Sequence, residues 1–373
     1  MHTQHFERLV FIFVLVLVFG ARFGPVWAQS APDCSTITYS DGDGNGKLDV
    51  GTLAQLQCLK NEGLGKDFEM TGDIDASTTS SWNGSKGFDP IGASGSAFTG
   101  TFDGNGHVIT GLYIDRSNKT GLFESVGSGA KIKNVGLEDV DVSGTDAVGG
   151  LVGVLNGMVT QSYATGSVSG ENAVGGLVGL LDGTVKKSYV AASVVASDDN
   201  VGGLVGECTG TVRQSYATGS VSGRNRIGGL IGLVDWGAGQ IAISYATASV
   251  SSNISNGLTG GLVGDNVGVS VVDSYWNTET SGQSSSDGGM PLTTTEMKGD
   301  AAKSKMGGFD FSSTWAVVDE GNNSGDAVSY PYLVSNRQTP NPAARRFRLT
   351  IRQSSPLVRR AGRLTKKTAR RMC

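Results

Sequence analysis

The chain has 373 residues and a formal net charge of −4; 57 residues are glycine and only 7% are aromatic. Glycine thus exceeds twice its average share of about 7%, and large apolar side chains are too scarce for one extensive globular core. Abundant Gly, Ser, Thr and Val instead favour short strands joined by tight turns.

Residues 1–28 have the features of a secretory signal peptide. Arg8 precedes the apolar run Leu9–Phe19, and a Val-Trp-Ala sequence ending at Ala28 provides a cleavage site. The alternative is a transmembrane anchor, which needs about 20 apolar residues, more than this run contains. We therefore expect an exported protein, secreted or at the cell surface, whose mature chain has no membrane-spanning segment.

Residues 29–96 are expected to form an N-terminal cap with an Asp/Gly-rich loop. Asp41, Asp43, Asn45 and Asp49 stand at positions 1, 3, 5 and 9 of a calcium-binding loop. Position 12, where a bidentate carboxylate is needed, is a threonine. The loop therefore predicts either a weak calcium site or a plain Asx/Gly turn, and no other cofactor is predicted.

That threonine begins the capping-box sequence Thr52-Leu53-Ala54-Gln55, which predicts a short helix able to cover the open end of a stacked fold. Cys34 and Cys58, in the same region, can form a disulfide in an exported protein. Cys208 instead occupies an apolar column of the repeats that follow. It is predicted to be a small buried hydrophobic residue.

Residues 97–276 are dominated by a repeated six-residue signature. Val-Gly-Gly-Leu-Val-Gly begins at Val148, and close copies begin at Val174, Val201, Ile227 and Thr259, at intervals of 26, 27, 26 and 32 residues. A fixed period of this size predicts a solenoid in which each repeat buries its apolar face against its neighbours. The signature positions predicted to be structural are Gly150, Leu151, Gly153, Gly176, Leu177, Gly179, Gly203, Leu204, Gly206, Gly229, Leu230, Gly232, Gly261, Leu262 and Gly264.

Three apolar columns recur in each repeat, and in the first regular repeat they contain Leu151, Val159 and Val168. They predict three short strands per coil of a parallel β-helix with coils of about 26 residues, stacked about 4.8 Å apart. A Ser-Tyr pair recurs with the same period. Its tyrosines are either a buried stack or an aromatic stripe for carbohydrate, and its serines are expected to form a hydrogen-bonded ladder. The tyrosines are Tyr163, Tyr189, Tyr216, Tyr245 and Tyr275.

Beyond the repeats, residues 277–340 are expected to form a C-terminal cap, with a short helix over Thr294–Met306 and bulky residues at Phe309–Trp315 and Tyr330–Leu333. Residues 341–373 contain eleven Arg and Lys and no acidic residue. This basic tail is predicted to be disordered. It either binds an anionic polymer through its charge or is functionally neutral.

The motif Gly150-Leu151-Val152-Gly153 with its copies, and the Ser-Tyr-Ala-Thr-Gly-Ser-Val-Ser-Gly runs at 162–170 and 215–223, resemble the GLUG-repeat family. The flanks at Phe98–Ile114 and Tyr275–Gly282 are similar too, so the resemblance covers about residues 40–335. It implies bacterial surface or secreted proteins with β-helical repeats, right-handed by the preference of the fold, including adhesin-like proteins and IgA-cleaving metallopeptidases.

The peptidase activity of that family is not implied for this chain. It lacks a His-Glu-x-x-His sequence, and its only histidines are His2, His5 and His107. One histidine in the mature chain cannot build a His-based triad or a multi-histidine zinc site. The carboxylates Asp182 and Asp235 share a turn position two coils apart, a separation of roughly 10 Å that is close to the range of an inverting pair. As ordinary turn formers they need no catalytic role.

We therefore predict an all-β parallel β-helix with a small helical cap at its N-terminus. Its expected function is that of a non-enzymatic, adhesin-like binding protein that presents a repetitive face to a polysaccharide or another cell-surface ligand. The alternatives are a polysaccharide lyase or hydrolase that uses Asp182 and Asp235, and a purely structural spacer.

Overall fold

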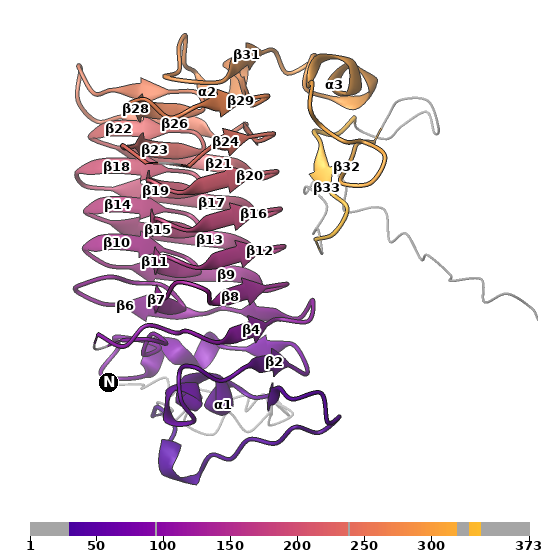
Figure 1. Cartoon of the computed structure of the whole chain (residues 1–373). Helices are drawn as coiled ribbons and strands as arrows, with labels where there is room; N and C mark the ends of the chain where they lie inside the picture. The colour runs from indigo at the N-terminus through magenta and orange to yellow at the C-terminus, as the bar shows by residue number, and fades with distance from the viewer. Residues whose placement is uncertain (1–29, 94, 238, 319–327, 337–373) are drawn as a thin grey trace, which may run out of the picture.

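The computed structural model describes residues 30–93, 95–237, 239–318 and 328–336. The expected signal peptide and the basic tail lie outside these residues. The described chain winds into a column of stacked coils whose walls are parallel β-sheets (Figure 1). The all-β parallel solenoid predicted from the repeats is confirmed, and in its regular part the paired residues of neighbouring coils, such as Val159 and Val185, follow each other at the repeat period.

Four sheets form the walls. Sheet A has nine strands, β1 (Leu48–Val50), β2 (Phe68–Met70), β4 (Thr101–Asp103), β8 (Lys131–Lys133), β12 (Met158–Thr160), β16 (Thr184–Lys186), β20 (Thr211–Arg213), β24 (Ile241–Ala242) and β29 (Val271–Val272). Sheet B contains β3 (Ile74–Asp75), β5 (Val108–Thr110), β6 (Tyr113–Asp115), β9 (Gly136–Ser143), β13 (Tyr163–Gly170), β17 (Tyr189–Ala196), β21 (Tyr216–Gly223), β25 (Tyr245–Ala246), β26 (Ser249–Ser252), β30 (Tyr275–Asn277) and β31 (Met290–Leu292).

The other two walls are shorter. Sheet C contains β7 (Phe123–Val126), β11 (Val152–Leu155), β15 (Val178–Leu181), β19 (Val205–Cys208), β23 (Ile231–Val234) and β28 (Val263–Asn266). Sheet D contains β10 (Asp146–Gly149), β14 (Asn172–Gly175), β18 (Asp199–Gly202), β22 (Asn225–Gly228) and β27 (Thr259–Gly260). Outside the walls, β32 (Trp315–Ala316) and β33 (Tyr332–Leu333) form a small antiparallel pair.

Each regular coil therefore has four strands, and the prediction of three was wrong. The repeated signature accounts for the additional strand, because it spans a corner between two strands and does not lie in the middle of one. In the first regular coil β10 ends at Gly149 and β11 begins at Val152, so Gly150 and Leu151 make the bend between sheets D and C. Leu151 is fully buried and fills that corner from the inside.

The signature glycines allow the coils to approach at these corners. A Cβ on Gly179 would lie 2.3 Å from the carbonyl carbon of Ala147 and 2.5 Å from the backbone nitrogen of Val148, in the coil before. A Cβ on Gly176 would lie 2.4 Å from the carbonyl oxygen of Gly203, in the coil after. Real Cβ contacts are not this short, so the corner excludes any larger residue.

The parallel ladder begins earlier than the sequence indicated. Sheet A starts at Leu48 in β1, within the region 29–96 that was expected to be a cap, whereas the repeats were expected to begin at residue 97. Beside these first strands lie three 3₁₀ helices, η1 (Cys34–Thr36), η2 (Leu59–Asn61) and η3 (Ser77–Ser81), and the helix α1 (Leu53–Cys58).

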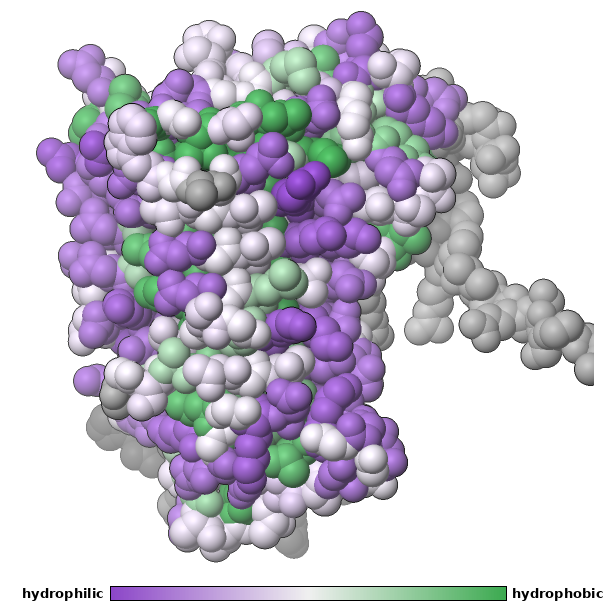
Figure 2. Space-filling view, in the orientation of Figure 1, coloured by the Kyte–Doolittle hydropathy of each residue, from purple (hydrophilic) through white to green (hydrophobic). Residues whose placement is uncertain are grey.

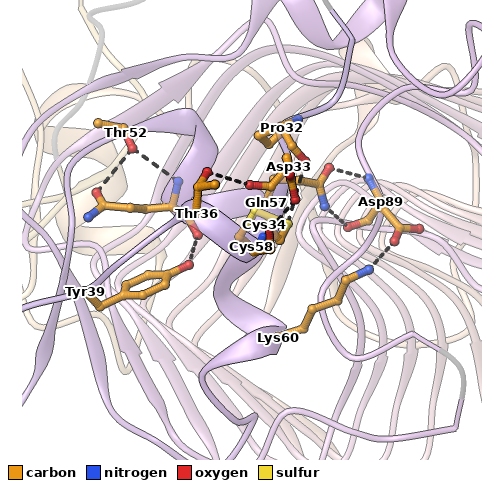
Figure 3. The surroundings of a disulfide bond; sticks show 12 residues. Pro32, Asp33, Cys34, Thr36, Tyr39, Thr52, Gln57, Cys58, Lys60 and Asp89 are labelled. Carbon is orange, nitrogen blue, oxygen red and sulfur yellow. Dashed lines mark hydrogen bonds and ion pairs between the residues drawn. A yellow bond between two sulfur atoms is a disulfide. The ribbon is translucent and has the colours of Figure 1, made fainter.

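The predicted capping helix is confirmed as α1. The Thr52 hydroxyl accepts a hydrogen bond from the backbone N–H of Gln55, and α1 lies at the N-terminal end of the column (Figure 1). The predicted disulfide is also present: Cys34 and Cys58 join η1 to α1 (Figure 3). Cys208 is fully buried and unpaired, and burial raises the pKa of its thiol to about 12.

After the last regular coil the chain turns back along the side of the column. The helix α2 (Thr278–Ser281) and β31 complete the final coil, and α3 (Gly299–Lys305) is the part of the predicted Thr294–Met306 helix that forms. Then α3, β32 and β33 lie beside the column (Figure 1). The expected cap residues therefore pack on a flank of the solenoid, over the outside of sheet B.

Candidate functional site

The tyrosines of the Ser-Tyr pairs form a stack outside sheet B. Their rings lie nearly parallel, with centroid distances of 4.9 Å between Tyr163 and Tyr189, 5.0 Å between Tyr189 and Tyr216, and 4.9 Å between Tyr216 and Tyr245. Each is at most 5% exposed, because the returning C-terminal segment covers them. Burial raises the pKa of Tyr189 and of Tyr245 well above the ordinary value. The tyrosines are therefore a buried stack and not an open stripe for carbohydrate.

The serine preceding each tyrosine is part of a ladder, as expected. The Ser188 hydroxyl accepts from the backbone N–H of Ser162 at 3.3 Å, and the Ser215 hydroxyl accepts from the N–H of Ser188 at 3.2 Å. Each hydroxyl donates to a carbonyl two residues earlier, for example Ser215 to Arg213 at 2.9 Å. These serines are fully buried and their hydroxyls are engaged, so their role is to connect coils.

The two candidate carboxylates, Asp182 and Asp235, lie in the turns between sheets C and A, and each makes a local bond there. Asp182 accepts from the hydroxyl of Thr209 in the next coil, and Asp235 accepts from the backbone N–H of Trp236 at 2.7 Å. Thr209 occupies the same turn in the coil between them, and each carboxylate binds a turn residue and not the other carboxylate.

A third carboxylate, Glu207, lies close to both and was missed in the sequence. It is paired in register with Leu180 and Leu233 on the two neighbouring strands, so it stands between two leucines of sheet C. The side-chain amide of Asn200 donates to it at 3.0 Å. Burial raises the pKa of Glu207, and the charges of Asp235 and Asp182 add to that increase. A Glu at a position that is leucine in the repeats before and after it was the available signal.

The turn that contains Asp235 also carries the most exposed large hydrophobic side chain among the described residues. Trp236 is 77% exposed. Its loop, residues 235–240, joins β23 to β24, whereas only Asp182 and Gly183 join β15 to β16. The Trp236 ring packs toward Gly268 in the following turn, and Gln240 accepts a hydrogen bond from Arg213 at 3.4 Å beside it.

The Asp/Gly-rich loop near the N-terminus uses its side chains as turn formers. Asp41 accepts from the backbone N–H groups of Asn45 at 3.0 Å and Gly46 at 2.8 Å, and the Gly46 bond is the main cause of its lowered pKa. Asp49 accepts from Gly42 at 2.9 Å, and Asn45 binds both Asp43 and Glu69. Across the part of the chain that the structure describes, no group of three or more His, Cys, Asp or Glu is arranged to hold a metal ion. A calcium site there stays a prediction.

A cleft of about 490 Å³ lies between the N-terminal region and the first coils. Its walls carry the cationic side chains of Lys86, Arg116 and Lys119 and three carboxylates. The repeat pattern did not predict this cleft, because most of the residues that line it lie in loops outside the signature. Within the described ranges, no helix has the length and apolar character needed to cross a membrane.

No protein-family model matches the chain. Halomucin of Haloquadratum walsbyi is 37% identical over 312 residues, which is 73% of this chain but 3% of halomucin. A "Putative Gly-rich membrane protein" of Evansella cellulosilytica is 28% identical over 159 residues, 41% of this chain and 18% of that protein. The chain thus spans a small part of both relatives.

A solved structure described as "a putative immunoglobulin A1 protease" from Bacteroides ovatus is similar in fold. The TM-score is 0.57 at 20% sequence identity, over 78% of this chain and 93% of the other. At this identity the likeness shows that the two share the solenoid fold.

Proposed function

We propose that this chain is an exported, non-enzymatic binding protein of the GLUG-repeat type, adhesin-like and located at the cell surface or secreted, whose ligand is a polysaccharide. The exposed Trp236 is the observation that carries the proposal. A large aromatic ring held in water presents a flat apolar surface with a polar edge, which suits contact with a sugar ring. The names of the two sequence relatives, a halomucin and a Gly-rich membrane protein, support a surface location.

The surface beside Trp236 supports a polymeric ligand. On the outside of sheet A, Thr160, Lys186 and Arg213 are paired in register on successive coils. A polysaccharide lying along the column would therefore meet a new row of polar side chains about every 4.8 Å. The face seen in Figure 2 is largely hydrophilic or pale, with hydrophobic areas separated by polar ones, which favours many weak contacts over one apolar pocket.

A glycan array tests this proposal with the full chain, a variant that lacks residues 341–373, and Trp236→Ala. We expect binding to one class of polysaccharide that survives removal of the tail and falls at least about tenfold with Trp236→Ala, the scale of losing one aromatic anchor. The matched control is Val195→Ala, because Val195 is also exposed, at 44%, but lies on sheet B. Binding that disappears with the tail would assign recognition to its charge. No binding at all would leave a structural spacer as the better description.

Glu207 favours a second candidate function, that of a polysaccharide hydrolase. A carboxyl group with a raised pKa beside two further carboxylates has the properties of a general acid. Product analysis of any bound glycan decides between the two functions. Release of shorter chains that stops with Glu207→Gln, while binding continues, would establish the enzyme. Intact glycan after prolonged incubation would support the non-enzymatic binding protein.

A further inference from the structure

The cleft near the N-terminus lies outside the surface on which the proposed function rests. Residues 86–93 and 115–119 form two of its sides, and Glu124 in β7 and residues 143–145 complete it. Its volume of about 490 Å³ is within the range of small-molecule sites. It lies in the first coils, away from the turn that carries Trp236, so the two sites are independent.

Two carboxylates of the cleft already have partners in the protein. Asp89 forms an ion pair with Lys60, and its backbone N–H and carbonyl bind the side-chain amide of Gln57 at 2.9 and 3.0 Å (Figure 3). Asp115 accepts a hydrogen bond from the Ser143 hydroxyl at 3.1 Å. Their negative charge is therefore partly used to hold the walls of the cleft together.

Two of the three cationic groups are less well satisfied. Arg116 donates through Nη2 to the carbonyls of Gly87 at 3.2 Å and Phe88 at 3.0 Å and forms an ion pair with Asp89 at 3.7 Å, so its charge is already used within the protein. Among the residues described, Lys86 and Lys119 form no ion pair and no side-chain hydrogen bond; the charge of Lys119 acts on Glu124 from a greater distance. These two lysines thus bring donors and positive charge that an anionic oxygen in the cleft would satisfy.

We propose that this cleft binds a carboxylated sugar unit of a glycan, with the carboxylate held by Lys86 and Lys119. The other side chains that line the cleft can contact the hydroxyl groups and the ring of such a sugar unit. Ser117, Asn118 and Thr145 offer hydroxyl and amide groups to sugar hydroxyls, and Pro90 and Ala93 provide a small apolar surface. A bare inorganic anion would leave these walls unused.

Glu124 makes the site sensitive to pH. Burial raises its pKa and so does the charge of Asp89, whereas Lys119 opposes the increase; Asp115, Arg116 and Lys86 also line the space it faces. Protonation of Glu124 removes a negative charge next to the bound carboxylate. Affinity for the ligand therefore rises as the pH falls through the pKa of Glu124, until the carboxylate of the ligand is itself protonated.

Isothermal titration calorimetry on the full chain tests the proposal with trigalacturonic acid as the probe, galactotriose as its neutral counterpart and sulfate as a simple anion. We expect trigalacturonic acid to bind, and Lys86→Met and Lys119→Met each to weaken it at least about tenfold. The control Lys66→Met removes a lysine that is exposed elsewhere and pairs with Glu62. Glu124→Gln should strengthen binding near neutral pH and remove most of its pH dependence.

Three results would overturn the proposal. Equal affinity for galactotriose would exclude a role for the carboxylate, and equal affinity for sulfate would mean a site for anions only. Unchanged binding in both lysine variants, with the variants folded by circular dichroism, would place recognition outside the cleft. Trp236→Ala should leave trigalacturonic acid binding in the cleft unchanged, so a failure of the proposed function and a failure of this site can be told apart.

Discussion

The side-chain amide of Asn336 donates a hydrogen bond to the backbone carbonyl of Lys187 at 3.1 Å, across 149 residues of sequence. Lys187 lies at the corner before the Ser-Tyr pair of a middle coil, whereas Asn336 is at the end of the described C-terminal segment. This bond and the cover over the tyrosine stack attach the described C-terminal segment to coils whose residues come much earlier in the sequence.

The cover should be a major contributor to stability. Trp315 is 1% exposed and lies 6.0 Å from Tyr216, 5.9 Å from Tyr245 and 4.7 Å from Phe309 between ring centroids. We expect Trp315→Ala to lower the free energy of unfolding by about 3–5 kcal/mol, as for other buried aromatic truncations. Chemical denaturation followed by circular dichroism measures this. Trp236→Ala is the control, with an expected change within about 0.5 kcal/mol; equal losses in both variants would contradict the buried cover.

The close approach at the signature corner makes a second prediction. Gly179→Ala places a methyl group against the backbone of the coil before, so we expect a loss of about 3 kcal/mol in the free energy of unfolding. Gly72→Ala is matched to it, because a Cβ on Gly72 meets nothing within 4 Å. That variant should be as stable as the parent. A tolerated alanine at position 179 would mean that the coils are not packed as described.

Removing one hydroxyl should weaken the serine ladder. Ser215→Ala leaves the buried N–H of Ser188 without its acceptor, which costs about 1–3 kcal/mol. Ser193→Ala, on the exposed face of the neighbouring strand, removes a hydroxyl of the same kind that water can replace. The midpoint of thermal unfolding should therefore be lower for Ser215→Ala than for Ser193→Ala. Indistinguishable midpoints would argue against a structural role for the ladder.

Glu207 should make stability depend on pH. Its pKa is raised in the folded state, so the folded protein holds the proton more tightly than the unfolded chain does. Stability from this group is present below the ordinary glutamate pKa and is lost as pH rises through the raised value. In melting curves from about pH 4 to about pH 7, Glu207→Gln should show a smaller decline than the parent. An unchanged decline would assign it to other groups, Glu124 first.

The periodic part of the fold was predictable because each coil repeats the same environment. Columns such as Val159 and Val185 follow from spacing alone, and the capping box and the disulfide are local signals. The fourth strand was not predictable in this way. The corner at Gly150 and Leu151 looks like part of an apolar run until the backbone is seen to bend there.

The candidate sites were harder to predict, because they depend on residues that depart from the pattern. Glu207 stands where the preceding repeat has a leucine, and Trp236 stands in a longer turn. A prediction from the repeat follows the residues that recur, so it misses both of these exceptions. The orientation of the tyrosines depended on a segment more than a hundred residues from Tyr163. The cleft is built mainly from loops that precede the first signature, where the period gives no information.

The attachment of the returning segment restricts how this gene can change its number of repeats. Each coil contacts mainly its neighbours, so duplication of a coil lengthens the column by about 4.8 Å without disturbing the others. Between Lys187 and Tyr275, however, such a duplication would move Asn336 and Trp315 away from their partners, because the segment that spans these coils keeps its length. Repeat expansion should therefore be tolerated before Lys187 and selected against between Lys187 and Tyr275.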